Sequence, residues 1–382
     1  MRASTEKRVH MTVDVKALPK IPPPWVARCL LALNRGLARV RRALIPPQLY
    51  LFELGTAMWT AQCLHAIARL GVAEHLESGP GSAEQIAAAL DLHAPSLYRV
   101  LRMLCGYGIF AEDANRRFAL THIGEKLLPG VPGSAHAMLV YNGQKWQTEP
   151  YAQVEFTLRT GKPAFDHAFG MPFFDYVAAH QDVASQFDRA MTSVSQLHAS
   201  AVLGAYDFSN IGTLVDVGGG NGLLLSAILS ANPQVRGILF DLPRVVEQAR
   251  PQLAAAGVAE RCDIQEGDFF ERVPAGADAY MMSHIVHDWD DDRCRTLLRA
   301  CRAGMAPEAR LLVIDVIIAP GDNRFDQGKL TDMQMLFVLT GRERTALEFR
   351  DLLASAGFTI RRIVRTAAPE CIIEAIPSDV LG

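Results

Sequence analysis

The second half of the chain alternates short apolar runs with stretches of helical periodicity. The runs that predict strands all lie after residue 212 and are "TLVDVGGG", "RGILFDLP", "CDIQEGDFF", "DAYMMSHIV", "RLLVIDVII", "FTIRRIV" and "ECIIEAI". Apolar strands that alternate with helices are typical of a parallel α/β sheet covered by helices. We therefore predict an α/β domain over residues 201–382, with a Rossmann-like sheet of seven strands.

The first half shows helical periodicity instead. Residues 48–75 are largely apolar and predict a helix, and Ser82 with Gln85 form a capping box at the start of a short second helix. A third helix is predicted by "APSLYRVLRMLCGYGIF", and "IFAEDANRRFALT" predicts two short strands around a polar turn, as in a β-wing. Residues 131–200 are again helical in pattern. We expect a mainly helical, winged-helix-like domain over residues 47–200.

Residues 1–46 form a basic arm in front of these domains. Residues 1–44 contain ten Lys and Arg residues and two acidic residues. Apolar side chains at spacings of three and four predict one helix with an apolar stripe, formed by Leu30, Leu33, Leu37, Val40 and Leu44. Three interpretations stay open: a helical arm that packs on a partner subunit, a surface helix that contacts anionic lipid, or a loosely held tail.

Composition narrows the class of protein. No run of eighteen apolar residues occurs among the 382, so we expect no stable membrane insertion. The winged-helix-like residues 47–130 carry six basic and eight acidic side chains, too little positive charge to neutralise several phosphates, so we expect no nucleic-acid partner. The seven cysteines include no C-x-x-C pair, which favours a reducing, cytoplasmic environment.

A glycine-rich stretch, "GGGNG", directly follows the first predicted strand. Gly218 and Gly220 in it allow the backbone to pass close to a ligand. Asp241 ends the second strand, where a carboxylate can accept hydrogen bonds from a pair of ribose hydroxyls. The stretch lacks the G-x-G-x-x-G spacing of pyrophosphate sites, so adenosine without a pyrophosphate fits better. Asp268 follows the third strand, where it can meet the adenine amino group while Phe269 packs on the ring.

Five motifs together resemble one enzyme family. In this order, "LVDVGGGNG", "FDLP", "GDFF", "HDWDDD" and "GRERT" are similar to the S-adenosylmethionine-dependent O-methyltransferases of the plant phenolic and bacterial polyketide and phenazine type. The helical first half resembles the dimerisation domain of that family. The resemblance implies a homodimer that uses S-adenosylmethionine to methylate a phenolic hydroxyl of an aromatic small molecule.

The resemblance also implies roles for single residues. His287 corresponds to the general base, and Glu343 and Asp315 to carboxylates that orient it, although Asp315 is one carbon shorter than the usual glutamate. The implied cofactor contacts are Asp216, Gly218, Gly220, Asp241, Leu242, Asp268, Phe269, Ser283 and Asp288. The implied acceptor contacts are Phe187, Met191, His284, Gln334 and Val338.

An alternative interpretation of "SHIVHDWDDD" is a metal-binding site. His284 and His287 with the neighbouring aspartates contain suitable ligand types. However, a strand that continues to His287 would turn these two imidazoles to opposite faces, and acidic residues are favoured at the start of the following helix. We therefore expect no metal. The alternative functions are a methyltransferase-fold enzyme with diverged chemistry (N-methylation or hydroxylation) and a cofactor-sensing DNA-binding regulator.

Overall fold

The computed structural model describes residues 12–15, 18–19, 21–321, 323 and 325–378. The first eleven residues of the predicted basic arm therefore lie outside the described residues. The chain forms two compact units. The first comprises residues 1–35, 153–179 and 195–382, and the second comprises residues 36–152 and 180–194.

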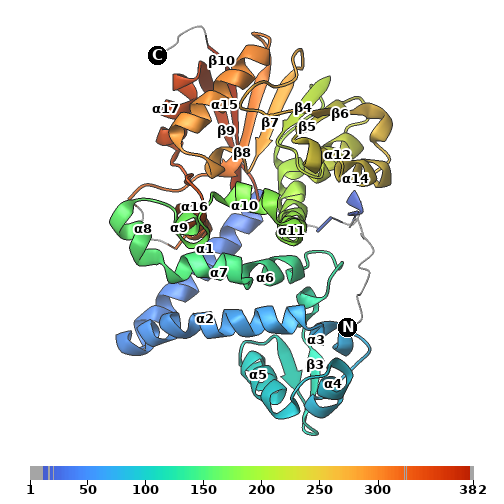
Figure 1. Ribbon diagram of the computed structural model, residues 1–382, viewed down its shortest axis with the longest axis vertical. Helices are drawn as coiled ribbons and strands as arrows, with labels where there is room; N and C mark the ends of the chain where they lie inside the picture. Colours follow the sequence, from blue (N-terminus) through green and yellow to red (C-terminus); the bar gives the residue numbers. More distant parts are fainter. Residues whose placement is uncertain (1–11, 16–17, 20, 322, 324, 379–382) are drawn as a thin grey trace. The chain divides into compact units, whose positions relative to one another are not determined.

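A seven-stranded sheet forms the centre of the first unit, in the order β6-β5-β4-β7-β8-β10-β9 (Figure 1). Its strands are β4 (Thr213–Val217), β5 (Arg236–Asp241), β6 (Cys262–Glu266), β7 (Ala279–Ser283), β8 (Arg310–Val316), β9 (Phe358–Arg365) and β10 (Glu370–Pro377). The five strands β4 to β8 are parallel, which confirms the predicted α/β class. The last two strands depart from the parallel prediction, since β10 is antiparallel to both neighbours. The short link between β9 and β10 is a hairpin, whereas a parallel connection needs a long crossover.

Helices cover both faces of this sheet. One face packs against the end of α11 (Gln181–Ala205), α12 (Leu223–Ala231), α13 (Pro243–Val246) and α14 (Ala249–Ala255). The other face packs against α15 (Asp291–Gly304) and α17 (Ala346–Ser355). Leu225 of α12 and Leu297 of α15 are completely buried on the two faces. This double cover leaves the carboxyl ends of the parallel strands as the edge where loops can gather around a ligand.

Four further helices belong to the first unit: α8 (Val154–Thr160), α9 (Ala164–Phe169), α10 (Phe173–Ala179) and α16 (Gln327–Val338). The helices α8 and α9 both contact α16. Phe165 of α9 is fully buried and packs edge-on against Phe173 of α10. The neighbouring Phe174 stacks on Trp289 at 5.3 Å between ring centroids, so α10 covers the segment that contains the predicted base.

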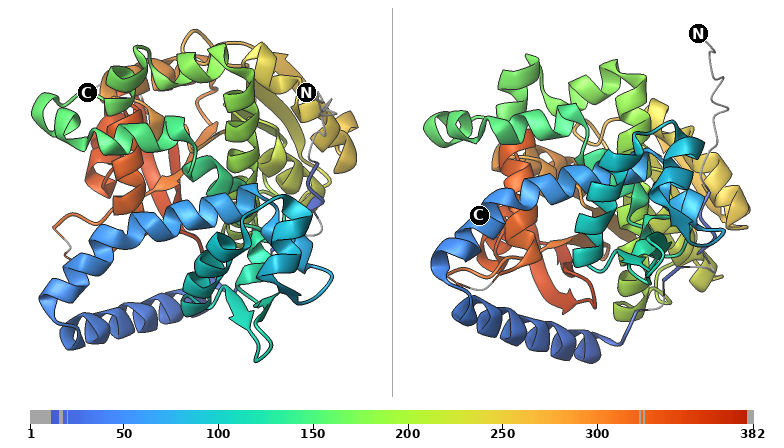
Figure 2. Two further views of the ribbon diagram at one scale, coloured as in Figure 1. Left: turned by 60° about the horizontal axis from the view of Figure 1, so that its bottom comes forward. Right: turned by 90° about the horizontal axis from the view of Figure 1, so that it is seen from below.

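The second unit is mainly helical. It contains α2 (Pro47–Arg69), α3 (Val72–Leu76), β1 (Gly81–Ser82), α4 (Ala83–Leu90), α5 (Ala94–Gly106), β2 (Phe110–Glu112), β3 (Arg117–Leu120), α6 (His136–Asn142) and α7 (Lys145–Ala152). The predicted capping box of Ser82 and Gln85 is confirmed. The predicted wing is confirmed as the antiparallel pair of β2 and β3 (Figure 2). The single helix expected over residues 48–75 is instead two, because Gly71 adopts a left-handed φ of 72° between them.

The amphipathic helix expected in the N-terminal arm is α1 (Pro24–Leu44). Its apolar stripe is open to solvent in the isolated chain: the five leucine and valine side chains named above are each more than half exposed. Arg41 at its end forms an ion pair with Glu53 of α2 at 2.6 Å. Among the described residues, no helix is long and apolar enough to cross a membrane.

Candidate active site

The glycine-rich turn between β4 and α12 forms an open backbone cradle. Gly218 and Gly220 have left-handed φ values of 71° and 59°, which only glycine adopts without strain. A Cβ on Gly218 would lie 2.5 Å from Cδ1 of Ile285, so the turn passes closely under the loop after β7. No described atom lies within 4 Å of the corresponding position on Gly220. The turn is therefore closely packed at Gly218 and open at Gly220, so a ligand can approach the backbone at Gly220.

Asp241 at the end of β5 fixes this turn. Its carboxylate accepts hydrogen bonds from the backbone N–H of Gly220 at 2.9 Å and of Leu242 at 2.7 Å. Asp216 of β4 lies beneath the turn and is nearly completely buried. Burial, with a smaller contribution from the charge of Asp241, raises the pKa of Asp216 to about 8. Asp241 thus shapes the loop itself, a role that the sequence did not suggest, while Asp216 packs against Gly219 from below.

The other predicted cofactor residues end the neighbouring strands. Asp268 follows β6 and accepts a hydrogen bond from the backbone N–H of Phe270 at 2.8 Å. Phe269 is half-buried, and its ring lies 3.4 Å from where a Cβ on Gly218 would stand. Ser283 ends β7, and its buried hydroxyl has no hydrogen-bond partner among the described residues. The structure therefore gathers these predicted residues at the carboxyl ends of β4 to β7, where open α/β sheets bind ligands.

His287 lies in a single 3₁₀ turn, η4 (Val286–Asp288), directly beyond β7. Its Nδ1 lies 2.9 Å from Oε1 of Glu343 and 3.9 Å from Oδ1 of Asp315. Its Nε2 lies 3.5 Å from Oδ1 of Asp288. The side chains of Glu343 and Asp315 are fully buried. Burial raises the pKa of Glu343 to about 8 and that of Asp315 to about 6.

This geometry assigns different tasks to the two nitrogens of His287. When Nδ1 donates a hydrogen bond to the Glu343 carboxylate, the lone pair of the neutral imidazole is on Nε2, which can accept a proton. An ionised Glu343 in this position can stabilise a positive charge on the ring. Asp315 is too distant to share this hydrogen bond and can influence the imidazole only through its charge.

Two further residues, which the sequence analysis missed, hold the Glu343 loop against His287. Gly341 approaches so closely that a Cβ there would lie 1.9 Å from the carbonyl oxygen of His287. Arg344 is completely buried and donates hydrogen bonds to the carbonyl oxygens of Val286 and Trp289, each at 2.9 Å. Both residues belong to the motif "GRERT", in which the sequence resemblance implied a role only for Glu343.

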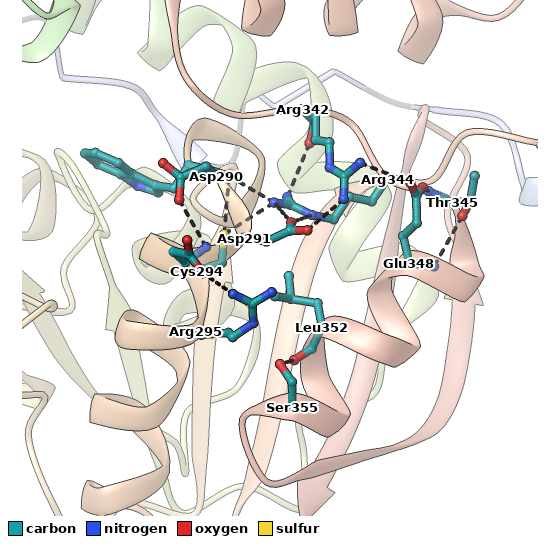
Figure 3. Close-up of polar contacts among 12 residues, drawn as sticks. Asp290, Asp291, Cys294, Arg295, Arg342, Arg344, Thr345, Glu348, Leu352 and Ser355 are labelled. Carbon is teal, nitrogen blue, oxygen red and sulfur yellow. Dashed lines mark hydrogen bonds and ion pairs between the residues drawn. The ribbon is translucent and has the colours of Figure 1, made fainter. Parts of the chain in front are cut away.

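Arg344 also forms an ion pair with Asp291 at 2.8 Å, and Arg342 contacts the same carboxylate (Figure 3). Asp290 is the N-cap of α15, and its carboxylate accepts hydrogen bonds from the backbone N–H groups of Asp292 and Arg293. The prediction that these aspartates begin a helix is thus confirmed.

The strand before His284 is shorter than the sequence predicted. The strand expected to continue to His287 ends at Ser283, and His284 has a positive φ of 55°. The chain therefore turns, and the rings of His284 and His287 lie side by side, 5.1 Å between centroids, instead of facing opposite ways. The apolar residues Ile285 and Val286 suggested a longer strand, but beyond the turn they pack into the hydrophobic core on the α15 and α17 face of the sheet.

Glu370 and His198 complete the surroundings of His284. Glu370 begins β10, and its Oε1 lies 3.4 Å from Nε2 of His284. Burial opposes charge on His284, but hydrogen bonding and attraction by Glu370 raise its pKa to about 9. His198, on α11, lies with its ring 4.8 Å from that of His284. No motif in the sequence marks His198 or Glu370.

The predicted acceptor residues lie on two helices besides His284. Gln334 and Val338 are one turn apart on α16 in the first unit, with Gln334 half-buried and Val338 buried. Phe187 and Met191 are one turn apart on the part of α11 that belongs to the second unit, and both are half-buried. The ring of Phe187 lies 6.3 Å from that of Tyr141 in the same unit.

Comparison with known proteins matches both parts of the chain to one family. The O-methyltransferase domain matches residues 151–359, and the O-methyltransferase dimerisation domain matches residues 52–130. The chain is 39% identical to the phenazine O-methyltransferase PhzM of Lysobacter antibioticus, over 88% of this chain and 98% of that one. It is 35% identical to the 8-amino-8-demethylriboflavin N,N-dimethyltransferase of Streptomyces davaonensis, over 81% and 90%.

A solved structure shows the same fold with cofactor bound. It is an O-methyltransferase from neocarzinostatin biosynthesis in complex with S-adenosylmethionine and 2-hydroxy-5-methyl naphthoic acid. The TM-score is 0.73 at 31% identity, and the match covers 83% of this chain and 96% of that one. The chain belongs to the family of S-adenosylmethionine-dependent methyltransferases that combine an O-methyltransferase domain with a dimerisation domain.

Proposed function

We propose that this enzyme methylates a phenolic hydroxyl of an aromatic small molecule, with His287 as the general base. The observation that carries this proposal is the hydrogen bond of 2.9 Å between Nδ1 of His287 and buried Glu343, which leaves Nε2 to accept the acceptor's proton. The named activity of the 39% identical phenazine O-methyltransferase supports the choice of a hydroxyl.

A base that acts while the new bond forms suits the energetics. A phenol with a pKa of about 10 and an imidazole with one of about 6.5 differ by roughly 5 kcal/mol in proton affinity, so complete deprotonation beforehand is costly. S-adenosylmethionine supplies the methyl group on a sulfonium centre and already contains the leaving group. The protein's task is then to hold the acceptor and remove its proton as the charge develops.

The shape of the glycine-rich turn supports the assignment of the cofactor residues. Gly218 and Gly220 provide the open backbone, and Asp241 and Leu242 lie at the end of the next strand at the same edge. Ser283 ends β7, Asp268, Phe269 and Asp288 lie beyond the strand ends, and Asp216 lies beneath the turn. These residues would hold the adenosine and amino-acid parts of the cofactor.

We further propose a cytoplasmic homodimer in which residues 47–200 form the dimerisation and substrate-lid domain and residues 201–382 the catalytic domain. The match of residues 52–130 to the dimerisation domain supports the dimer. The exposed apolar stripe of α1 within residues 1–46 supports the interpretation of the arm as part of a subunit interface. Phe187, Met191, His284, Gln334 and Val338 would contact the acceptor.

Incubation with S-adenosylmethionine and a panel of hydroxylated phenazines and naphthoic acids tests the proposal. We expect the product to gain the mass of CH₂ and S-adenosylhomocysteine to form in equal amount. Gain of an oxygen atom would show diverged chemistry, and absence of turnover on every phenol would contradict the proposed acceptor class.

N-methylation is the second candidate, because a 35% identical relative is named as an N,N-dimethyltransferase. A base at Nε2 of His287 can equally accept a proton from an aromatic amine. Matched pairs of acceptors that differ only in a hydroxyl or an amino group at one ring position separate the two candidates. Higher kcat/KM on the hydroxyl member supports O-methylation, and the reverse order supports N-methylation.

A further inference from the structure

Three side chains beside the proposed base, two of them buried, converge on one point. His198 of α11, His284 after β7 and Glu370 at the start of β10 come from distant parts of the chain. Their ligand atoms all lie within 4.8 Å of one another. His198 is 3% exposed and Glu370 7%, while the side chain of His284 is 23% exposed and provides an open side.

Within the described part of the chain, the polar atoms of this cluster form no well-aligned hydrogen bond, although both imidazoles lie within ion-pair distance of Oε1 of Glu370. Among the described residues, Nδ1 of His198, Nε2 of His284 and Oε2 of Glu370 have no hydrogen-bond partner. Each unpartnered buried polar atom costs free energy, so native proteins usually supply a partner to it. A metal ion that replaces the proton held by His284 would give the two imidazoles and the carboxylate one common partner.

The spacing fits a divalent metal ion. Two ligands at about 2.0–2.1 Å from a tetrahedral ion lie about 3.3 Å apart. Oε1 of Glu370 lies 3.4 Å from Nε2 of His284 and 4.0 Å from Nδ1 of His198, and all three ligand atoms lie within 4.8 Å of one another, so the side chains would move closer together to bind one ion. Two histidines and one carboxylate are a donor set that binds Zn²⁺ and Fe²⁺ and leaves coordination positions open.

A second group of potential ligands, His284, His287 and Asp315, shares one residue with this cluster. In that group Nδ1 of His287 is already engaged by Glu343 at 2.9 Å. Among the described residues, the imidazole nitrogens that face Glu370 in the His198 group have no such hydrogen bond. We propose that His198, His284 and Glu370 form a binding site for one divalent first-row transition-metal ion, next to but separate from the proposed base.

The proposed metal site is not needed for methyl transfer. It also differs in its ligands from the metal site considered in the sequence, which combined His284 with His287 and the following aspartates. With three protein ligands, the ion keeps at least one position for water or for an oxygen of a bound molecule. The centroids of His284 and His287 are 5.1 Å apart, so such an oxygen would be held beside His287.

Metal binding to the untagged full-length protein tests this proposal. Protein stripped with a chelator is dialysed against Zn²⁺, Fe²⁺ under anaerobic conditions, or Co²⁺, and bound metal is counted. We expect one equivalent per chain with at least one of these ions, and visible d–d absorption for Co²⁺. Failure of all three ions to bind at one equivalent would overturn the proposal.

Four variants locate the site. Glu370→Gln and His198→Asn should each weaken binding by about 100-fold or more, since even supporting residues around a metal contribute 10- to 100-fold. Glu374→Gln is the matched control, because Glu374 is a completely buried glutamate on the same strand that contacts Tyr206 and Arg362 instead. It should retain the metal, as should His287→Ala.

Thermal unfolding and S-adenosylhomocysteine binding verify that each variant is folded. Unchanged affinity in either Glu370→Gln or His198→Asn, with a folded protein, would contradict the assignment. Loss of metal in His287→Ala would likewise overturn it in favour of the group that contains Asp315. If His198→Asn does not fold, Glu370→Gln with its control Glu374→Gln still decides the question.

Discussion

Glu343→Gln isolates the charge that His287 needs when it accepts a proton. The glutamine has nearly the same shape, and its amide oxygen can still accept the Nδ1 hydrogen bond that spans 2.9 Å in the wild type. At pH values above about 8, where Glu343 is ionised, the substitution therefore keeps the orientation of the ring and removes the negative charge next to it.

The size of the effect follows from the hydrogen bond. A hydrogen bond to a charged partner contributes about 1.5–3 kcal/mol, and a tenfold change in rate corresponds to about 1.4 kcal/mol. We expect kcat to fall by about 10- to 150-fold, because the charged imidazole develops only towards the transition state. KM for S-adenosylmethionine should change little, since Glu343 is not among the residues proposed to hold the cofactor.

The pH dependence provides a second readout. Burial raises the pKa of Glu343 to about 8, so in the wild type the carboxyl group ionises and becomes a better partner for the imidazolium as the pH rises towards 8. The part of the pH–rate profile that arises from this ionisation should be absent in Glu343→Gln.

Steady-state kinetics on the best phenol from the panel measure both effects. Glu374→Gln is the control, because it changes a buried glutamate on β10 that contacts Tyr206 and two arginines away from His287. Wild-type kcat in Glu343→Gln, or an equal loss in Glu374→Gln, would refute the role derived for Glu343.

Three further predictions follow from neighbouring groups. Asp315→Asn removes a negative charge 3.9 Å from His287, so the acid limb of the kcat/KM profile should move to lower pH; a shift to higher pH would contradict this reasoning. Gly341→Ala places a Cβ 1.9 Å from the carbonyl oxygen of His287, so it should cost about 1–3 kcal/mol or more in urea unfolding and lower kcat, whereas the control Gly204→Ala, with no described atom within 4 Å, should do neither. Burial raises the pKa of Asp216 to about 8, so the folded state holds a proton that the unfolded state loses above about pH 4; stability should fall by up to about 1.4 kcal/mol per pH unit between these values, and Asp216→Asn should flatten that slope, which urea unfolding across pH measures.

Much of the fold was predictable because its signals are local. Each strand of the sheet is a short apolar run, and the glycines after β4 adopt the conformations that their residue type suggests. Gly71 was not recognised as a break in a helix, since a single glycine is also tolerated inside helices.

The candidate site was predictable only where a motif surrounds the residue. His287 and Glu343 belong to such motifs, and the structure brings them together. His198 and Glu370 were missed because their contacts are with residues far away in the chain and no motif surrounds them. Arg344 was missed although it lies in "GRERT", because its role depends on carbonyl groups more than fifty residues away. The turn at His284 was missed because the buried residues that follow it have the composition of a strand.

The central claim is that Nε2 of His287 removes the acceptor's proton. Single-turnover rates of His287→Ala, measured with saturating S-adenosylmethionine and the best phenol, test it most directly, with cofactor affinity from calorimetry as the companion value. We predict a loss of about 10²- to 10⁴-fold in the rate, as expected for a general base, with cofactor affinity nearly unchanged. A methyl-transfer rate equal to that of the wild type would contradict the claim.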